Sequence, residues 1–251
     1  MAEQKQSKLE EMTTGLLRRL GVIEQQSSPE FASRSDYKGT WEALTGTLDD
    51  AKMVVTGYTD EDQYDVTARR TVEILDSFVG IQPTDTFLEI GCGVGRVGKL
   101  LAPRCARWIG TDISGHMLAY AADRLQGLDN VTLIELSTVG LGEIPDASVD
   151  VVYCTVVFMH LYEWDRYTYV TEAMRVLKPG GRCFFDNVDI TTDHGWNLFM
   201  AGHSHPIAQR PPHLSMVSSG DELQTYAQRA GFTNVEVHRW DDAWVGVTGV
   251  K

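Results

Sequence analysis

The sequence predicts an α/β protein built on a mostly parallel sheet of seven strands, and three observations support this. From Thr86 onward, short runs rich in β-branched and aromatic residues alternate with helical segments of roughly ten to fifteen residues, the pattern of repeated βαβ units. A glycine-rich turn follows the first of these runs. With 251 residues, 43% of them apolar and 23% charged, the chain suits one sizeable α/β domain with a small appendage.

Strands and helices are expected to alternate along the second part of the chain. The runs rich in Val, Ile, Phe, Tyr and Trp predict strands over 86–90, 107–111, 131–136, 149–156, 182–186, 235–239 and 244–250. Between them, helices are expected over 96–101, 114–125, 164–177 and 221–230. The segment 187–219 has no clear period and holds four of the seven histidines, so we expect a long functional or mobile loop there.

The first eighty residues are predicted to form a helical cap outside the main sheet. One amphipathic helix is expected near the N-terminus and another over 60–79, with a polar linker over 25–28. We therefore divide the chain into an N-terminal cap or lid region, 1–80, and a main domain, 81–251. The apolar stripe of the first helix consists of Leu9, Met12, Leu16, Leu17, Leu20 and Ile23.

Charge and hydropathy argue against several classes of function. Thirty-five acidic against 22 basic residues give a net charge of −13 without a basic stripe, which disfavours a nucleic-acid partner. The longest apolar run, 151–159, is too short to span a membrane, and the N-terminus lacks the apolar core of a secretion signal. The four cysteines have no metal-ligand spacing. We expect a cytoplasmic protein with buried thiols and no membrane partner.

The turn after the first predicted strand is the most informative stretch, with the sequence FLEIGCGVGR over 87–96. Glycines let the backbone pass close to a ligand and adopt positive φ, and the helix that follows offers free N–H groups. Twenty-one residues after Gly91, at the end of the next predicted strand, Asp112 can accept two hydrogen bonds from a ribose diol. The pattern predicts a site for an unphosphorylated adenosine ribose.

Two classes of cofactor are compatible with the glycines. Gly93, Gly95 and Gly98 satisfy the G-x-G-x-x-G spacing of nicotinamide dinucleotide sites. The Glu89 carboxylate just before the turn would repel a pyrophosphate, however, and it suits a ligand that carries an ammonium group. A nicotinamide-dependent oxidoreductase is the alternative interpretation.

These residues resemble a known family, the class I S-adenosylmethionine-dependent methyltransferases. The resemblance covers 86–251 in the family's order, and it implies a Rossmann-like fold, methyltransferase activity, S-adenosylmethionine as cofactor and S-adenosylhomocysteine as product. The segments similar to the family's successive motifs are 88–95 at the glycine turn, 112–118 after the second strand, 149–152 and 158–161 at the fourth strand and its turn, 175–182 before the fifth strand, and 230–232 after the last helix.

The resemblance implies a set of cofactor contacts. Glu89 and the backbone of Gly91, Gly93 and Gly95 would hold the methionine part of the cofactor, and Asp112 would bind its ribose. Ser137 and Thr138 stand where the family often has an acidic residue near the adenine amino group, which is a departure from its pattern. The remaining implied contacts are Ile113 and Met117 on the adenine, Thr155 beside the sulfonium, and Arg96, which would meet a carboxylate unless it is a solvated helix residue.

Methyl transfer from a sulfonium needs alignment of the nucleophile, the methyl group and the sulfur, and a general base helps when the acceptor is a hydroxyl or an ammonium group. His160, in the turn after the fourth predicted strand, and His194, after the fifth, are the candidate bases; for His160 the alternative is a packing role beneath the cofactor. His203 and His205 lack a third ligand, so no metal is expected.

The sequence thus predicts an enzyme that methylates an oxygen or nitrogen atom of a small-molecule metabolite. The alternatives are the nicotinamide-dependent oxidoreductase and a non-catalytic module that binds S-adenosylmethionine. The methyl acceptor and the oligomeric state are not evident from the sequence. Five aromatic residues could build an apolar acceptor pocket: Tyr37, Trp41, Trp164, Trp196 and Phe199.

Overall fold

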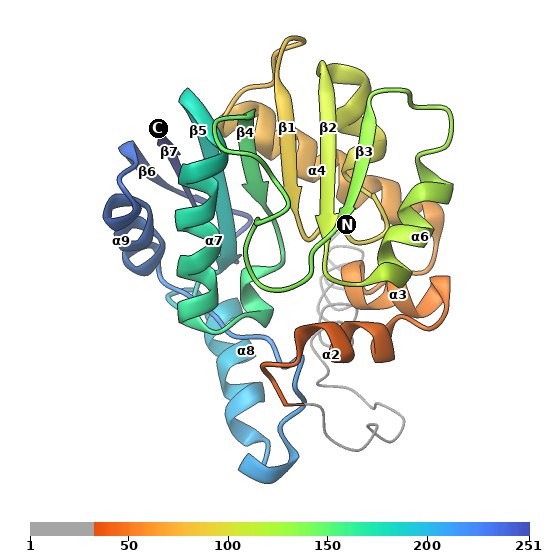
Figure 1. Ribbon diagram of the computed structural model, residues 1–251. Coiled ribbons are helices and arrows are strands. Elements are labelled where there is room, and N and C mark those ends of the chain that lie inside the picture. The colour runs from red at the N-terminus through yellow and green to blue at the C-terminus, as the bar shows by residue number, and fades with distance from the viewer. Residues whose placement is uncertain (1–32) are drawn as a thin grey trace, which may run out of the picture.

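A computed structural model describes residues 33–251, so the predicted N-terminal helix and the linker over 25–28 lie outside the described residues. A seven-stranded sheet forms the centre of the described part (Figure 1). Its strands are β1 (Thr86–Ile90), β2 (Arg107–Asp112), β3 (Val131–Glu135), β4 (Val149–Cys154), β5 (Leu177–Val188), β6 (Thr233–Trp240) and β7 (Trp244–Val250).

The strands lie in the order β3-β2-β1-β4-β5-β7-β6. Strands β1 to β5 pair in parallel, whereas β7 runs antiparallel between β5 and β6. This confirms the predicted sheet of seven mostly parallel strands. Dinucleotide-binding folds instead use the strand order 3-2-1-4-5-6, so the antiparallel β7 between β5 and β6 separates this sheet from theirs.

Side chains of the central strands alternate between two core clusters, because successive residues of a strand point to opposite faces of the sheet. Phe87 and Tyr153 lie in the cluster that includes residues of α4 (Glu61–Phe78), α5 (Gly98–Leu101) and α6 (Gly115–Arg124). Leu88 and Val152 lie in the other cluster, with α7 (Glu163–Val176) and α9 (Gly220–Ala230). Helices therefore cover both faces of the sheet, as Figure 1 shows.

The prediction of a long loop over 187–219 was wrong in part. The segment contains the helix α8 (Asp193–Ser204) and a 3-10 turn over Ile207–Gln209. The Thr192 hydroxyl caps α8 by accepting a hydrogen bond from Gly195 N at 3.0 Å. Gly195 itself has no room for a Cβ, which would lie 1.9 Å from the Asp189 carbonyl oxygen. Glycine inside a helix lowers its intrinsic propensity, which hid the helical period in the sequence.

Two short helices, α2 (Tyr37–Leu44) and α3 (Leu48–Thr56), lie across the carboxyl ends of the parallel strands (Figure 1). The Tyr37 hydroxyl donates a hydrogen bond to Asp165 Oδ2 at 2.6 Å and accepts one from Tyr162 N at 3.0 Å. At the other side of the sheet, Gly115 N donates to Glu42 Oε1 at 2.7 Å, which places a carboxylate at the N-terminus of α6. Helix α2 is thereby attached to the first turns of both α6 and α7.

Helix α4 was predicted as part of the N-terminal cap, yet it packs on the sheet. Its Val72 and Leu75 belong to the same buried cluster as Phe87 and Trp108. Among the described residues of the predicted region 1–80, α2 and α3 alone lie over the strand ends, and the boundary at residue 80 stays a prediction.

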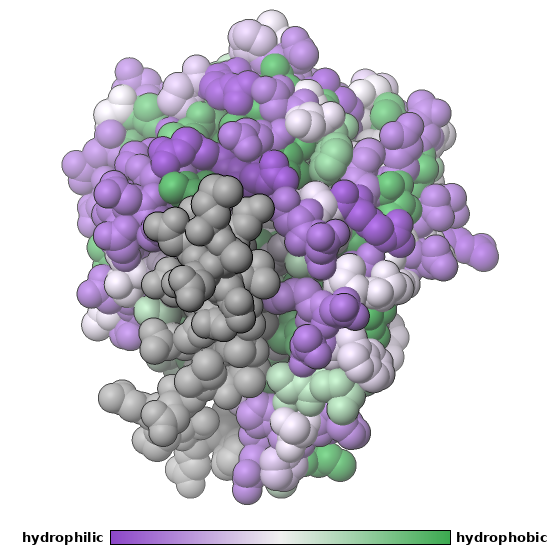
Figure 2. Space-filling view, turned by 180° about the vertical axis from the view of Figure 1, so that it is seen from behind, coloured by the Kyte–Doolittle hydropathy of each residue, from purple (hydrophilic) through white to green (hydrophobic). Residues whose placement is uncertain are grey.

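Membrane-spanning helices are absent from the part of the chain that the structure describes. Hydrophilic residues cover most of the coloured part of the face in Figure 2, and hydrophobic residues are scattered among them. Within 33–251, every helix is too short or too polar to cross a bilayer.

The attachment of α2 can be tested with Tyr37→Phe, which removes the hydroxyl and keeps the ring. Losing these hydrogen bonds should cost about 1–2 kcal/mol of local stability, so amide hydrogen exchange in 37–44 should become about tenfold faster. Exchange of β1 and β4 should stay unchanged, because neither strand depends on that hydroxyl. Unaltered exchange in α2 would show that the attachment does not hold the helix down.

Candidate functional site

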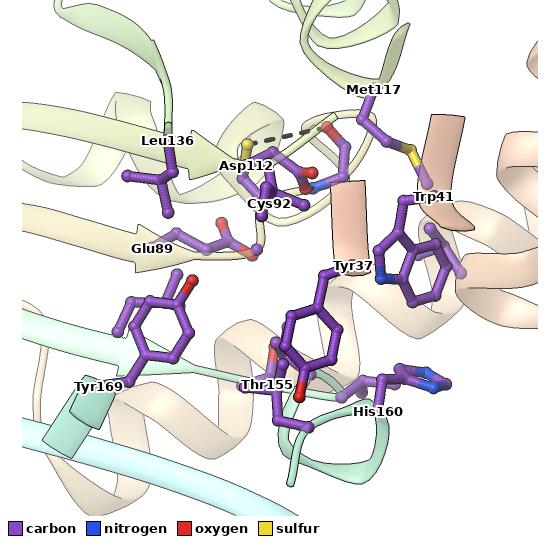
Figure 3. Close-up of a pocket in the computed structure, with 18 of the residues that line it drawn as sticks. Tyr37, Trp41, Glu89, Cys92, Asp112, Met117, Leu136, Thr155, His160 and Tyr169 are labelled. Atoms are coloured by element: carbon purple, nitrogen blue, oxygen red, sulfur yellow. Dashed lines mark hydrogen bonds between the residues drawn. The ribbon is translucent and has the colours of Figure 1, made fainter. Parts of the chain in front are cut away.

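A pocket opens at the carboxyl ends of β1, β2 and β4, beneath α2 and α3, where ligands bind in open parallel sheets. It encloses about 890 Å³ of space, including the open solvent at its mouth. Asp112, Cys92 and Met117 lie on one side of it, and Tyr37, Thr155 and His160 lie on the other (Figure 3).

The glycine turn forms the floor of the pocket. Gly91, Gly93 and Gly95 have backbone φ angles of +69°, +53° and +74°, which residues other than glycine rarely adopt. At Gly91 a Cβ would also lie 2.4 Å from the Val157 side chain. The turn after β1 therefore packs directly against the turn after β4, and only a glycine fits between them.

The turn after β4 is held in an unusual conformation. Val156, which lines the pocket, has a φ of +64°, a strained value for a β-branched residue. Its N–H donates a hydrogen bond to Asp186 Oδ1 at 2.7 Å. Asp186 stands near the end of β5 and is buried, so the neighbouring strand fixes the direction of this turn.

The Glu89 carboxylate is buried at the end of β1 and faces the pocket (Figure 3). The Tyr153 hydroxyl donates a hydrogen bond to Glu89 Oε2 at 2.5 Å, and Trp108 Nε1 donates to the Tyr153 hydroxyl at 2.9 Å. Burial raises the pKa of Glu89 to about 8, although the bond from Tyr153 opposes this. Without a ligand, the side chain therefore keeps its proton near neutral pH, and a cation placed beside it would favour the charged form.

Asp112, the last residue of β2, lies on the opposite wall. Its Oδ2 accepts a hydrogen bond from Gly93 N and its Oδ1 accepts one from Ser114 N, both at 2.9 Å. Burial raises the pKa of Asp112 to about 6, and the two backbone bonds hold it lower than burial alone would. Each carboxylate oxygen has a further lone pair, so Asp112 can still accept hydrogen bonds from a diol.

Arg96 lines the same half of the pocket and is buried. Its Nη1 donates to the hydroxyls of Thr67 and Thr71 on α4, at 3.3 and 3.2 Å. Both hydroxyls donate in turn to backbone carbonyls of α4, so their oxygens act as acceptors toward the guanidinium. The Arg96 Nε is buried and has no hydrogen-bond partner among the described residues. This donor is suited to an anionic group in the pocket.

His160 lies in the turn after β4 and lines the pocket. Its Nδ1 is 3.0 Å from the His213 carbonyl oxygen. A carbonyl oxygen only accepts hydrogen bonds, so Nδ1 carries a proton that it donates to this oxygen. The Trp41 ring meets the imidazole edge-on, with centroids 4.9 Å apart.

The structure brings most of the predicted site residues together and leaves four out. The residues that line the pocket are Glu89, Gly91, Gly93, Arg96, Asp112, Ile113, Met117, Thr155 and His160. Gly95 shapes the turn from behind, where a Cβ would meet Leu125 at 3.0 Å. Ser137, Thr138 and His194 are not among the lining residues.

The placement of Ser137 and Thr138 has a local cause. β3 ends at Glu135, and Leu136 turns inward to line the pocket. Ser137 then points away, because its N–H and its hydroxyl both donate to Glu143 Oε1, at 2.9 and 2.7 Å. Thr138 is exposed. Neither side chain lines the pocket, and the adenine contact that the resemblance implies for them stays a prediction.

His194 belongs to the first turn of α8 rather than to the pocket wall. Burial lowers its pKa, and its Nε2 is buried without a partner among the described residues. It is not among the residues that line the pocket, so its role as a base stays a prediction.

Of the five aromatic residues predicted for an acceptor pocket, Tyr37 and Trp41 line it. Trp164, Trp196 and Phe199 do not, and they are 76%, 51% and 41% exposed. The sequence did not identify several of the apolar lining residues: Val54, Val55, Leu136, Val139, Leu161 and Tyr169.

The metal-ligating residue types are dispersed. All four cysteines are buried free thiols. Across residues 33–251, no three His, Cys, Asp or Glu side chains are grouped so that they could hold a metal ion.

Comparisons with known proteins point to one family. The methyltransferase domain family matches residues 88–185. A probable S-adenosylmethionine-dependent methyltransferase of Mycolicibacterium smegmatis is 34% identical over 147 residues, 58% of this chain and 51% of the relative. An O-methyltransferase of Aspergillus nomiae is 26% identical over 206 residues, 78% of this chain and 88% of the relative. The chain spans about half the length of several relatives that it matches.

Solved structures share the fold. A SAM-dependent methyltransferase of Leishmania major superposes with a TM-score of 0.64 at 17% identity, over 95% of this chain and 91% of that one. At this identity the likeness shows the fold, and it extends over nearly all of the chain.

The buried Glu89 should make the ligand-free protein less stable as the pH rises from about 5 to about 8. In this window the native carboxyl, with its raised pKa of about 8, keeps a proton that the unfolded chain, with a pKa of about 4.3, has lost. Stability therefore falls by up to about 1.4 kcal/mol per pH unit from this group.

Glu89→Gln should remove this dependence, so the free energy of unfolding of the variant relative to wild type should rise with pH in urea titrations at pH 5, 6, 7 and 8. The control, Glu73→Gln, changes a side chain that is 67% exposed and should follow the wild type. A constant difference between Glu89→Gln and wild type across these pH values would contradict the raised pKa.

Proposed function

Because this chain belongs to the class I S-adenosylmethionine-dependent methyltransferase family, we propose that it transfers a methyl group from S-adenosylmethionine to an oxygen or nitrogen atom of a small molecule. The observation that supports this most is the trio of buried ionisable groups around the glycine turn: Glu89, Arg96 and Asp112.

The chemistry of these groups fits the cofactor. Glu89 would accept from the ammonium group, the unpartnered Arg96 Nε would donate to the carboxylate, and Asp112 would accept from the ribose diol. The positive φ angles at Gly91 and Gly93 keep the floor free of side chains. A pyrophosphate, by contrast, would bring further negative charge next to two carboxylates.

The adenine would lie among apolar side chains. Ile113 and Met117 follow β2, and Leu136 and Val139 follow β3. The departure from the family pattern at Ser137 thus leaves this wall apolar, and we assign adenine binding to packing instead of to an acidic side chain.

The cofactor would supply an activated methyl group, and the protein would hold the acceptor in line with it. Thr155 and the strained Val156 border the space where the acceptor would meet it, and Asp186 holds this turn in place. Positioning of this kind is worth roughly 7–11 kcal/mol. His160, which lines the pocket in the turn after β4, would take a proton from the acceptor.

A small acceptor fits the site better than a macromolecule. The pocket lies beneath α2 and α3, and α2 is attached on both sides of the cleft, so a large substrate would meet these helices first. The net charge of −13 also disfavours nucleic acid. One relative, the Aspergillus nomiae protein, bears the name O-methyltransferase and is matched over most of its length.

The alternatives are separated by two measurements on the purified protein. Titration with S-adenosylhomocysteine and with NAD should show binding of the first alone, and NAD binding alone would overturn the proposal. Consumption of S-adenosylmethionine with a metabolite library distinguishes an enzyme from a module that only binds the cofactor.

Asp112→Ala should weaken S-adenosylhomocysteine binding at least tenfold, since it removes two charge-assisted hydrogen bonds, each worth roughly 1.5–3 kcal/mol. Isothermal titration calorimetry measures this, with circular dichroism to check the fold. Asp129→Ala, at an exposed loop position, is the control and should bind as wild type does. Equal affinity of Asp112→Ala and wild type would show the ribose assignment to be wrong.

His160→Gln should lower turnover about a hundredfold, the lower end of what a general base contributes. Its S-adenosylhomocysteine affinity should stay within about threefold of wild type, because the residue lies on the acceptor side of the pocket. Turnover is measured with an acceptor from the library screen, and affinity by calorimetry. Parallel losses of turnover and affinity would assign His160 a packing role.

A further inference from the structure

The turn after β4 holds a valine in a backbone conformation that suits glycine. At Val156 the φ of +64° strains the β-branched side chain. Within residues 33–251, the other non-glycine residues with positive φ are Ala147, Asn234, Asp241 and Asp242. None of these is β-branched, and Asn and Asp tolerate this region comparatively well. A residue type that strains the backbone beside a pocket suggests that its side chain serves a function there.

The backbone of this turn is held on both sides of the strained residue. Val156 N donates a hydrogen bond to Asp186 Oδ1 at 2.7 Å. The next side chain, Val157, lies against the glycine turn, where a Cβ at Gly91 would meet its Cγ2 at 2.4 Å. We therefore expect a substitution at Val156 to change the side chain and to keep the course of the backbone.

Val156 belongs both to the pocket and to a buried apolar cluster behind it. It lines the pocket, and it is partly buried against Met159, Val188 and Leu198. This cluster joins the turn to β5 and to α8, and none of its three buried residues lines the pocket. The valine therefore stands between the end of the pocket and the cluster. A glycine at this place would enlarge the pocket toward α8.

The place of this turn relative to a bound cofactor follows from the sheet. Strand β1 pairs in parallel with both β2 and β4, so the three carboxyl ends meet at one edge. Under the proposed function, on which this inference rests, Asp112 holds the ribose at the end of β2 and Glu89 holds the ammonium group at the end of β1. The remaining substituent of the sulfonium would then point to the end of β4, where Thr155 and Val156 line the pocket.

We propose that the Val156 side chain limits the size of the alkyl group that the pocket accepts on the sulfonium. A methyl group fits beside the valine. A longer chain meets the branched side chain, which cannot retreat because the backbone is held on both sides and the cluster lies behind it. Val156 is then a specificity-determining residue for methyl transfer, and this role accounts for a valine where glycine would relieve the strain.

The test compares three ligands that differ only at sulfur: S-adenosylmethionine and its analogues with an ethyl or an n-propyl group in place of methyl. Their dissociation constants are measured by calorimetry on the full chain. Wild type should bind the n-propyl analogue at least about tenfold more weakly than S-adenosylmethionine, with the ethyl analogue between them, because the extra methylenes overpack the site. Equal affinity of wild type for all three ligands would overturn the proposal.

Variants assign this discrimination to the valine. In Val156→Gly, and in Val156→Ala as a second variant, the n-propyl analogue should bind within about threefold of S-adenosylmethionine, since the freed space takes the added carbons. Val156→Thr keeps a branched side chain of similar size and should discriminate as wild type does. Discrimination that persists in both Val156→Gly and Val156→Ala would overturn the proposal.

The strain provides a second readout. Val156→Gly and Val156→Ala both lose the branched side chain, but only glycine removes the strain of the positive φ. In urea titrations, the unfolding equilibrium constant of Val156→Gly should therefore be at least about twofold smaller than that of Val156→Ala. A glycine variant less stable than the alanine variant would contradict the strain and overturn the proposal.

The matched control for this readout is Ala147→Gly. Ala147 has a φ of +48°, is exposed and does not line the pocket. Glycine there should stabilise the protein in the same way and leave the affinities for all three ligands unchanged. A change in the affinity ratio in Ala147→Gly would show that the relief of strain, rather than the size of the pocket, alters the discrimination, and it would overturn the proposal.

Titration with S-adenosylhomocysteine, made first on every variant, separates the two possible failures. This ligand lacks the third substituent on sulfur, so its affinity should change far less among the variants than that of the n-propyl analogue. If wild type does not bind it, the proposed function fails and this inference fails with it. If wild type binds it and accepts the n-propyl analogue as well as S-adenosylmethionine, the size limit alone is wrong.

Discussion

The burial of two carboxylates, Glu89 and Asp112, is the constraint on which the rest of this site depends. An acid taken out of water at the end of a strand is costly unless polar groups or a ligand compensate it. The structure compensates each acid in part: Tyr153 and Trp108 form a chain of hydrogen bonds to Glu89, and two backbone N–H groups hold Asp112. Part of the cost of burying these acids remains. Under the proposed function, a ligand with an ammonium group and a diol would compensate it.

The same strand ends determine the shape of the pocket. Gly91 has no side chain, so the turn after β4 can approach the turn after β1, and the bond from Val156 N to Asp186 fixes that approach. The helix α2 then closes the space from above through Tyr37 and Glu42, which reach the first turns of α7 and α6. Ionisable groups thus lie on the sheet side and aromatic rings on the cap side, and under the proposed function the cofactor would occupy the sheet side.

The sequence predicted the sheet, the glycine turn and the two carboxylates because each depends on a local pattern: period-two runs, glycines at fixed spacing, and an acid at a strand end. The sequence did not predict features that depend on contacts between residues distant in the chain. No pattern near Glu89 indicates its hydrogen bond with Tyr153, which lies 64 residues away. No pattern near Ser137 indicates that Glu143 directs the Ser137 side chain away from the pocket. The helix α8 was missed because Gly195 and Gly202 interrupt its period, although the Thr192 cap was a usable signal.

The central claim is that Glu89 must lose its proton to receive the ammonium group of the cofactor. Its pKa of about 8 in the ligand-free protein makes this measurable. Calorimetric titration with S-adenosylhomocysteine between pH 6.5 and 8, in two buffers of different ionisation enthalpy, gives both the affinity and the protons exchanged. The account predicts proton release that approaches one per site and an affinity that rises by up to about tenfold per pH unit, with both effects lost in Glu89→Gln. Binding without proton release, at an affinity that is independent of pH, would contradict it.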